Sequence, residues 1–212
     1  MKAANIAQYC ALMEEIKCRV AVVQGFLNGS WHTMYLASTI ESVCLQVRKI
    51  LELVALGSLV LNKDEYQRVH AEFAKHWNAP RILRDIERVN PHFYPQPFKD
   101  INGKFVDITS GFLTRKKFPD VYVKCGAILH ADNPYGSRVD YAYYQRSVQT
   151  WLTEIMILLG AHRISLLDDP SLYVVHMKEG EDDKVHAYTF VPIDRPEANN
   201  SIQATPNGSP DR

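Results

Sequence analysis

Net charge is the first thing that the sequence lacks. Its 24 lysines and arginines are balanced by 24 aspartates and glutamates, and the isoelectric point lies near 7.1. A chain without a global positive field has no general means of attracting nucleic acid. Any polyanion must therefore be bound by a local patch of basic residues.

Paired cysteines are missing as well. None of the four cysteines forms a CxxC pair, and three lie within apolar helical patterns, which indicates buried, reduced thiols and a cytoplasmic protein. These residues are Cys10, Cys18, Cys44 and Cys125.

Targeting and membrane segments are not expected either. The first ten residues contain no apolar stretch of the kind that a signal peptide requires. Residues 40–61 are apolar, but four charged side chains interrupt them. Charges inside a bilayer span are costly, so we expect no contact with a membrane.

The short motifs of familiar enzymes are absent too. No HExxH, Walker loop, GxGxxG or GxSxG sequence occurs, so these motifs give no sign of zincin, P-loop, dinucleotide-binding or serine-hydrolase chemistry. His176 and His186 are expected to oppose each other across a hairpin, but a zinc site needs three or four ligands. We therefore expect neither a metal nor a cofactor.

Helical spacing of apolar residues dominates what the sequence does contain. The segment 35–61 is apolar over most of its surface, which is typical of a helix in the middle of a bundle. The expected fold is therefore mainly α, a helical bundle. The expected helices are 5–27, 35–61, 64–77, 80–89, 116–131 and 140–161.

Two segments carry strand patterns instead. Asn102-Gly103 lies between apolar arms, which indicates a small inserted hairpin or an extended loop. Residues 172–192 alternate and are rich in β-branched and aromatic residues, which predicts a C-terminal β-hairpin. We expect one domain over residues 1–194. Residues 195–212, rich in Pro, Asn, Ser and Gly, are expected to form a disordered tail.

Charged residues form a strip along the helix expected at 35–61. Arg48 and Glu52 are four positions apart and can pair, and Glu41 lies on the same side. Two interpretations stay open. The strip is either a structural ion pair that fixes helix packing, or the lining of a polar groove.

Candidate chemistry is concentrated near residue 130. Lys124 and His130 are six positions apart, a rise of about 9 Å on a helix, and an Asn-Pro sequence follows. A cation that holds phosphate and a histidine that moves a proton are what metal-free RNA cleavage needs. Alternatively, His130 caps helix carbonyls or packs against Tyr135.

Neighbouring residues are candidates for substrate binding. The basic triplet 115–117 either contacts a phosphate backbone or is the solvated start of a helix. The aromatic residues between 135 and 151 either stack on bases or belong to the core. The candidate binding residues are Arg115, Lys116, Lys117, Asn133 and Tyr135.

These features together resemble the HEPN domains of bacterial defence and toxin systems. The resemblance lies in the long central helix, in the basic residue and histidine about six apart, and in the ending LHxxNPY at residues 129–135. It covers residues 5–161. It implies a helical bundle, metal-independent ribonuclease activity and a homodimer in which two signatures face one cleft.

Carried over residue by residue, the resemblance assigns His130 to the position of the catalytic histidine. Lys124 stands where the family has arginine, and Cys125 where it often has a polar residue. Lysine lacks the planar fork that grips phosphate through two hydrogen bonds. This departure puts retained catalysis in doubt.

Two functions are therefore expected from the sequence. The first is an RNA-directed, metal-independent endoribonuclease that uses Lys124 and His130. The second is a catalytically inactive HEPN-like module that recruits a protein partner through its hairpin edges or dimer face. A groove lined by both residues would favour the enzyme, whereas Lys124 on another face would favour the module.

Overall fold

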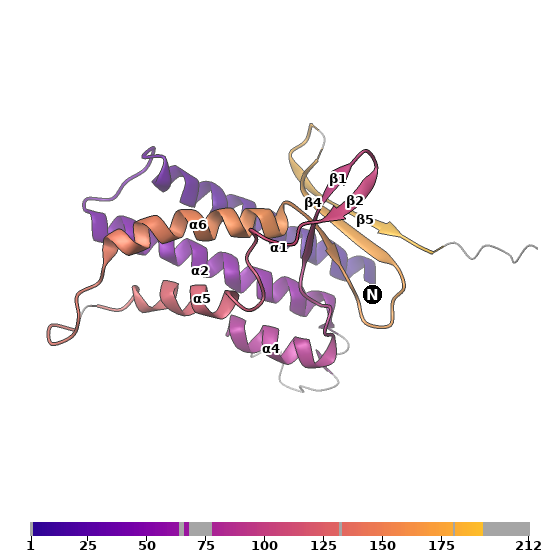
Figure 1. The fold of residues 1–212 in the computed structure, drawn as a ribbon, viewed down its shortest axis with the longest axis horizontal. Coiled ribbons are helices and arrows are strands. Elements are labelled where there is room, and N and C mark those ends of the chain that lie inside the picture. Colours follow the sequence, from indigo (N-terminus) through magenta and orange to yellow (C-terminus); the bar gives the residue numbers. More distant parts are fainter. Residues whose placement is uncertain (1, 64–65, 68–77, 132, 180, 193–212) are drawn as a thin grey trace, which may run out of the picture.

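The computed structural model describes residues 2–63, 66–67, 78–131, 133–179 and 181–192. Within these residues the chain forms helices and an antiparallel sheet (Figure 1). The helices are α1 (Lys2–Leu27), α2 (Leu36–Leu61), α4 (Ala79–Val89), α5 (Phe118–Ala127) and α6 (Tyr141–Gly160). The strands are β1 (Gln96–Ile101), β2 (Lys104–Asp107), β3 (Ala161–Ile164), β4 (Leu172–Glu179) and β5 (Lys184–Phe190).

The fold is mixed α and β, so the expectation of a mainly helical bundle is wrong in this respect. Both expected hairpins are present, and Asn102 and Gly103 turn the first one with positive φ angles. They are not separate, because β3 pairs with both β1 and β4. The result is one sheet with the strand order β2-β1-β3-β4-β5.

Two helices have other limits than the sequence predicts. The helix expected at 116–131 is shorter, because α5 begins at Phe118 and gives way to turns after Ala127. Helix α6 ends at Gly160, and Ala161 is extended and opens β3. The helix expected at 64–77 lies largely outside the described residues, and the tail expected at 195–212 lies entirely outside them.

Helix α4 begins as its sequence predicts. The side chain of Asn78 accepts a hydrogen bond from the backbone N–H of Arg81 at 3.1 Å, which satisfies one of the unpaired amides of the first turn. Pro80 lies within that turn, where its missing N–H costs nothing.

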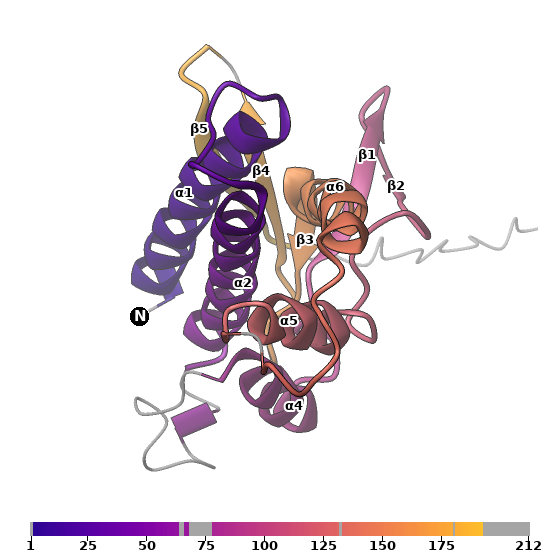
Figure 2. The same ribbon diagram turned by 90° about the vertical axis from the view of Figure 1, so that its left-hand side faces the viewer.

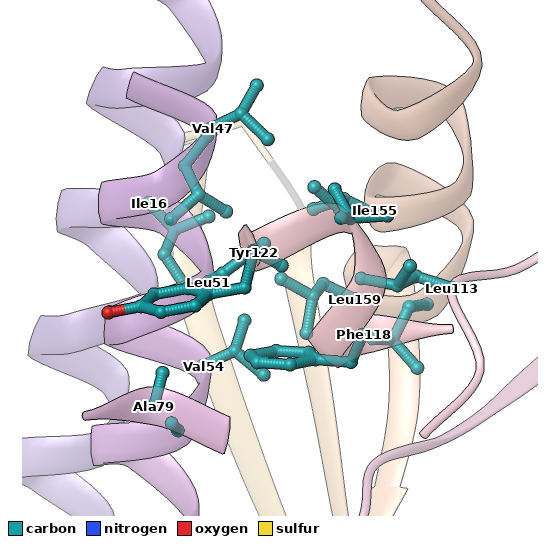
Figure 3. Packing of buried hydrophobic residues seen from close by; sticks show 14 of the residues in the cluster. Ile16, Val47, Leu51, Val54, Ala79, Leu113, Phe118, Tyr122, Ile155 and Leu159 are labelled. Carbon is teal, nitrogen blue, oxygen red and sulfur yellow. The ribbon is translucent and has the colours of Figure 1, made fainter. Parts of the chain in front are cut away.

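Helix α2 is the central element of the helical layer. It contacts α1, α4, α5 and α6, and Figure 3 shows Val47, Leu51 and Val54 facing the buried side chains of its neighbours. None of the described helices combines the length and the apolar character that a bilayer span requires. The continuous apolar surface of α2 is therefore explained by burial among helices.

The sheet lies at one end of this helical layer (Figure 1). Helices α1 and α6 contact it, and the alternate residues Tyr173, Val175 and Met177 of β4 belong to the shared core. Because side chains alternate along a strand, the intervening residues of β4 point away from the helices. The sheet thus has one face against the helices and one face turned outward.

A buried polar pair joins the sheet to α1. The imidazole of His162 is fully buried, and its Nδ1 lies 2.8 Å from the carbonyl oxygen of Leu159. A carbonyl can only accept, so Nδ1 carries the proton and the Tyr9 hydroxyl donates to Nε2 at 2.7 Å. Gly57 makes room for this tyrosine, since a Cβ at Gly57 would lie 2.9 Å from its ring.

This pair predicts a pH dependence of stability. Burial lowers the pKa of His162 to about 4, whereas the pKa of a histidine in an unfolded chain is about 6.5. Between these values the unfolded chain binds more protons, so the free energy of unfolding falls as the pH falls. We expect a loss of about 3 kcal/mol from pH 7 to below pH 4, measured by chemical denaturation.

The variant His162→Gln is the control for this prediction. It retains the carboxylates that also titrate in this range, so the wild type minus the variant isolates the histidine. The same slope in both proteins would show that His162 is protonated in the folded state.

Candidate functional site

An open groove of about 500 Å³ lies between α2 and α5. His130 contributes to it from the turn after α5, and Arg48 contributes from α2. Lys124 is not among the residues that form its walls. The groove is lined by Arg48, Tyr122, Val123, Gly126, Ala127, Leu129 and His130.

The guanidinium of Arg48 is held by two neighbours. Its Nη2 donates to the hydroxyl of Tyr122 at 2.8 Å, and its carbon lies 4.0 Å from the centre of the Tyr122 ring. Its Nε lies 3.4 Å from Oε1 of Glu52. Figure 3 shows the Tyr122 ring extending from α5 towards α2. Arg48 and Glu52 both contact Tyr122 and so join α2 to α5, and Arg48 also lines the groove, whereas Glu52 is not among the lining residues.

Gly126 makes this position of Arg48 sterically accessible. A Cβ on Gly126 would collide with Nη1 of Arg48. Glycine inside a helix costs about 1 kcal/mol relative to alanine, so its presence in α5 has a packing reason. The absent side chain lets the guanidinium lie directly against the backbone of α5.

Lys124 is engaged on another side of α5. Its Nζ lies 2.9 Å from Oδ2 of Asp120 and 5.6 Å from the centre of the Tyr143 ring. Hydrogen bonding to Tyr143 and to Asp120 raises the pKa of Lys124 above its usual range. The structure therefore brings Arg48, rather than Lys124, to the groove that His130 lines.

His130 is exposed and lies in the turn that follows α5. Its backbone N–H donates to the carbonyl of Ala127 at 3.4 Å, so the turn positions the residue. The imidazole is open to solvent, which a group that exchanges protons with a substrate requires.

The other predicted binding residues lie outside the walls of this groove. Arg115 pairs with Glu87 at 3.1 Å, and Lys117 pairs with Glu154 at 2.6 Å. Lys116 is exposed.

Asn133 and Tyr135 belong to the loop between α5 and α6. The Asn133 side chain accepts from the backbone N–H of Tyr135 at 3.0 Å, and the Tyr135 side chain is exposed. Glu41 lies 3.5 Å from the hydroxyl of Tyr141, which joins α2 to α6. None of these three residues is among those that line the groove.

The aromatic residues at the start of α6 serve the packing of the helices. Trp151 is buried, and the rings of Tyr143 and Tyr144 meet it edge to face at 6.5 and 6.3 Å. The Tyr144 hydroxyl donates to the carbonyl of Lys124 at 3.1 Å. These contacts favour the interpretation that the cluster joins α6 to α5.

The cysteines and histidines offer no second reaction centre in the described part of the chain. Hydrogen bonding to Cys44 and burial raise the pKa of Cys125, which keeps this thiol protonated. Cys18 is exposed, contrary to the expectation of buried thiols. His176 and His186 oppose each other as expected, but among the described residues no three potential ligands gather to hold a metal ion.

Sequence reasoning overlooked Tyr122 and Gly126. Both lie on α5 four positions apart, so they share one face of the helix. A glycine within a helix is a signal that could have been noticed, because it often marks a close approach. Their partner Arg48 is 74 positions from Tyr122 in the chain. A local sequence pattern cannot reveal a contact between residues so far apart.

Comparison of the chain with protein-family models, with curated proteins and with solved structures gave no match. The resemblance to HEPN domains therefore stays a prediction.

The variant Gly126→Ala tests the construction of the site. We expect it to displace the Arg48 guanidinium from Tyr122, so that the variant does not show the gain of about 1 kcal/mol that alanine otherwise brings to a helix interior and is less stable than the control. Thermal and denaturant unfolding measure the difference. Gly160→Ala is the matched control, since a Cβ there meets no atom within 4 Å. Equal stability of the two variants would contradict the close contact.

Proposed function

We propose that the protein is a HEPN-like, RNA-directed, metal-independent endoribonuclease whose scissile phosphate lies in the groove between α2 and α5. The observation that supports this proposal is that the Arg48 guanidinium and the His130 imidazole line one open groove. A fixed cation for the phosphate and an exposed group for proton transfer are the two requirements of this chemistry.

The reaction is a transesterification within the RNA chain. His130 takes the proton of the 2′-hydroxyl, the 2′-oxygen bonds to phosphorus, and the bond to the 5′-oxygen breaks. The leaving 5′-oxygen takes a proton from a solvent water molecule, the protonated His130 later returns its own proton to solvent, and the products are a 2′,3′-cyclic phosphate and a 5′-hydroxyl. Arg48 stabilises the negative charge that builds on the phosphate oxygens.

The charges around Arg48 suit an anionic ligand. Glu52 pairs with Arg48 and also with Lys49, whose Nζ lies 2.8 Å from Oε2. Two cations against one carboxylate leave one net positive charge beside the groove. Arginine also presents the planar fork that lysine lacks, so Arg48 supplies what Lys124 was expected to supply.

A homodimer is part of this proposal. Val123 lines the groove on α5 with 63% of its surface exposed, and Leu129 is also exposed. A second copy that covers these apolar side chains would place two grooves side by side, as the HEPN resemblance implies. The same exposed side chains favour the second candidate function, a catalytically inactive module that binds a protein partner at this surface. The position of Lys124 outside the groove favours that second function too, by the criterion stated from the sequence.

RNA cleavage by the purified protein in EDTA tests the proposal. We expect His130→Ala to lower the rate by about 10²–10⁴-fold, the usual contribution of general acid–base catalysis. Arg48→Lys should also slow cleavage, because it retains the charge and loses the fork. The matched control Lys124→Ala should cleave at close to the wild-type rate.

Each other outcome has a definite meaning. If Lys124→Ala loses most of its cleavage rate while Arg48→Lys stays active, Lys124 rather than Arg48 is the cation that stabilises the phosphate. Equal cleavage by the wild type and His130→Ala would rule out catalysis by this groove. No cleavage by the wild type, with His130→Ala folded and dimeric, would favour the interaction module.

A further inference from the structure

The sheet face turned away from the helices carries a set of aromatic rings. In β5, Ala187 faces α1, because it lines a cavity together with residues of that helix. Side chains alternate along a strand, so its neighbours His186 and Tyr188 point to the opposite face of the sheet. Cross-strand pairing places Arg163, Val174 and Tyr188 in one row. We call this surface the outer sheet face. Its members used below are Phe98, Phe105, Arg163, His176, Tyr188 and Phe190.

The rings of the outer sheet face contact one another across the sheet. Phe98 lies 4.7 Å from Phe105 and 5.7 Å from His176, measured between ring centres. Phe105 lies 6.1 Å from Phe190, although β2 and β5 are the two edges of the sheet. Strands are spaced about 4.8 Å apart, so this short distance requires the sheet to curl and makes the face concave.

These rings are only partly covered. Phe98 and Val174 are buried at the centre of the face, whereas Tyr188 is 43% exposed and Phe190 is 48% exposed. His186 stacks on Tyr188, with the ring planes 16° apart. Aromatic rings that neighbours hold in place and that stay partly exposed are the kind of surface on which single-stranded nucleic acids stack their bases.

A small polar cavity adjoins the rings. It measures about 290 Å³ and includes Leu172, which pairs directly with Phe190. Arg163 lies in it beside His92, Gln96 and Ser165. No aspartate or glutamate is among its lining residues, which are Pro91, His92, Tyr94, Gln96, Arg163, Ser165 and Leu172.

The guanidinium of Arg163 retains donors for a ligand. Asp107 contacts its Nη2, and a guanidinium carries N–H groups on three nitrogens. Carboxylates also lie beside β5, where Asp182 contacts His186 and hydrogen bonding to Glu179 raises the pKa of Tyr188. Because the lining of the cavity at Arg163 includes no carboxylate, an anionic group is favoured there, on the guanidinium donors that Asp107 leaves free.

We infer that the outer sheet face binds single-stranded RNA, with bases stacked on Tyr188 and Phe190 and a backbone phosphate held at Arg163. The choice of RNA rests on the proposed function. The groove and this face are at opposite ends of the molecule, since the turn after α5 lies away from the strands (Figure 1). A single RNA chain bound at both places would be held on the sheet while it is cut in the groove.

Figure 2 shows the same separation along the helical layer. The strands β4 and β5 lie behind α1 and α2, β3 lies beside α2 below α6, and α5 lies to one side of α2. Residues that bind at the sheet can therefore be changed without touching the walls of the groove. This separation makes the two proposals testable by different variants.

The test is the affinity of the full-length protein for a fluorescent 2′-O-methyl oligoadenylate, followed by fluorescence anisotropy. Methylation removes the nucleophile, so the probe stays intact even if the groove is active. We expect Tyr188→Leu and Phe190→Leu each to weaken binding by about tenfold, the usual effect of removing one stacking ring. Arg163→Gln should weaken binding and lower the salt dependence by about one phosphate contact.

Tyr35→Leu is the matched control, because this exposed tyrosine precedes α2 at the end remote from the sheet. It should bind like the wild type, and a duplex of the same length should compete poorly. Unchanged thermal unfolding shows that each variant is folded.

Weaker binding in the three variants, with the control unaffected, supports the inference whether or not the wild type cleaves RNA. Wild-type affinity in Tyr188→Leu and Phe190→Leu overturns it and leaves the cleavage result untouched. A wild type that does not bind the probe, or that binds the duplex equally well, also overturns it and leaves the face to a protein partner.

Discussion

Burial of α2 on several sides is the constraint on which the rest of the structure depends. A helix packed by α1, α4, α5 and α6 has little room for an ionised side chain, because a buried charge must be paired and hydrogen-bonded. Arg48 meets this requirement through Glu52 and Tyr122. Gly126 removes the side chain that would otherwise occupy the same space. The most polar point of the central helix is therefore also the point where α5 is fixed to it, and there the groove opens.

Local patterns predicted much of the secondary structure. Helical spacing of apolar residues located α1, α2, α4 and α6, and the Asn-Gly turn located the β1–β2 hairpin. The joining of the two hairpins was not predictable in this way, because it depends on β3. That strand has only four residues and follows α6 without a loop. Its sequence, which includes the buried His162, carries too short a pattern to distinguish a strand from one more helical turn.

The candidate site shows the same division between local and distant information. His130 was recognised because its residue type and its neighbours suggested chemistry. Lys124 was assigned to the same groove on the assumption that the helix continued to residue 131. Helix α5 gives way to turns after Ala127, so helical geometry no longer relates the two side chains. Arg48 was considered only as a structural or groove-lining residue, since its distance from residue 130 in the chain hid their proximity.

A chain without net charge can bind a polyanion only where it concentrates donors locally. The groove beside Arg48 and the cavity beside Arg163 are the places in the described structure where the two proposals put a phosphate. At each place a carboxylate, Glu52 or Asp107, contacts the guanidinium and lowers the local positive charge. Such sites attract a phosphate weakly on their own. Firm binding then requires additional contacts that charge does not supply, and aromatic stacking is a contact of this kind. A protein with this composition would therefore gain more from a stacking surface, in the proposed binding of RNA, than a basic protein would.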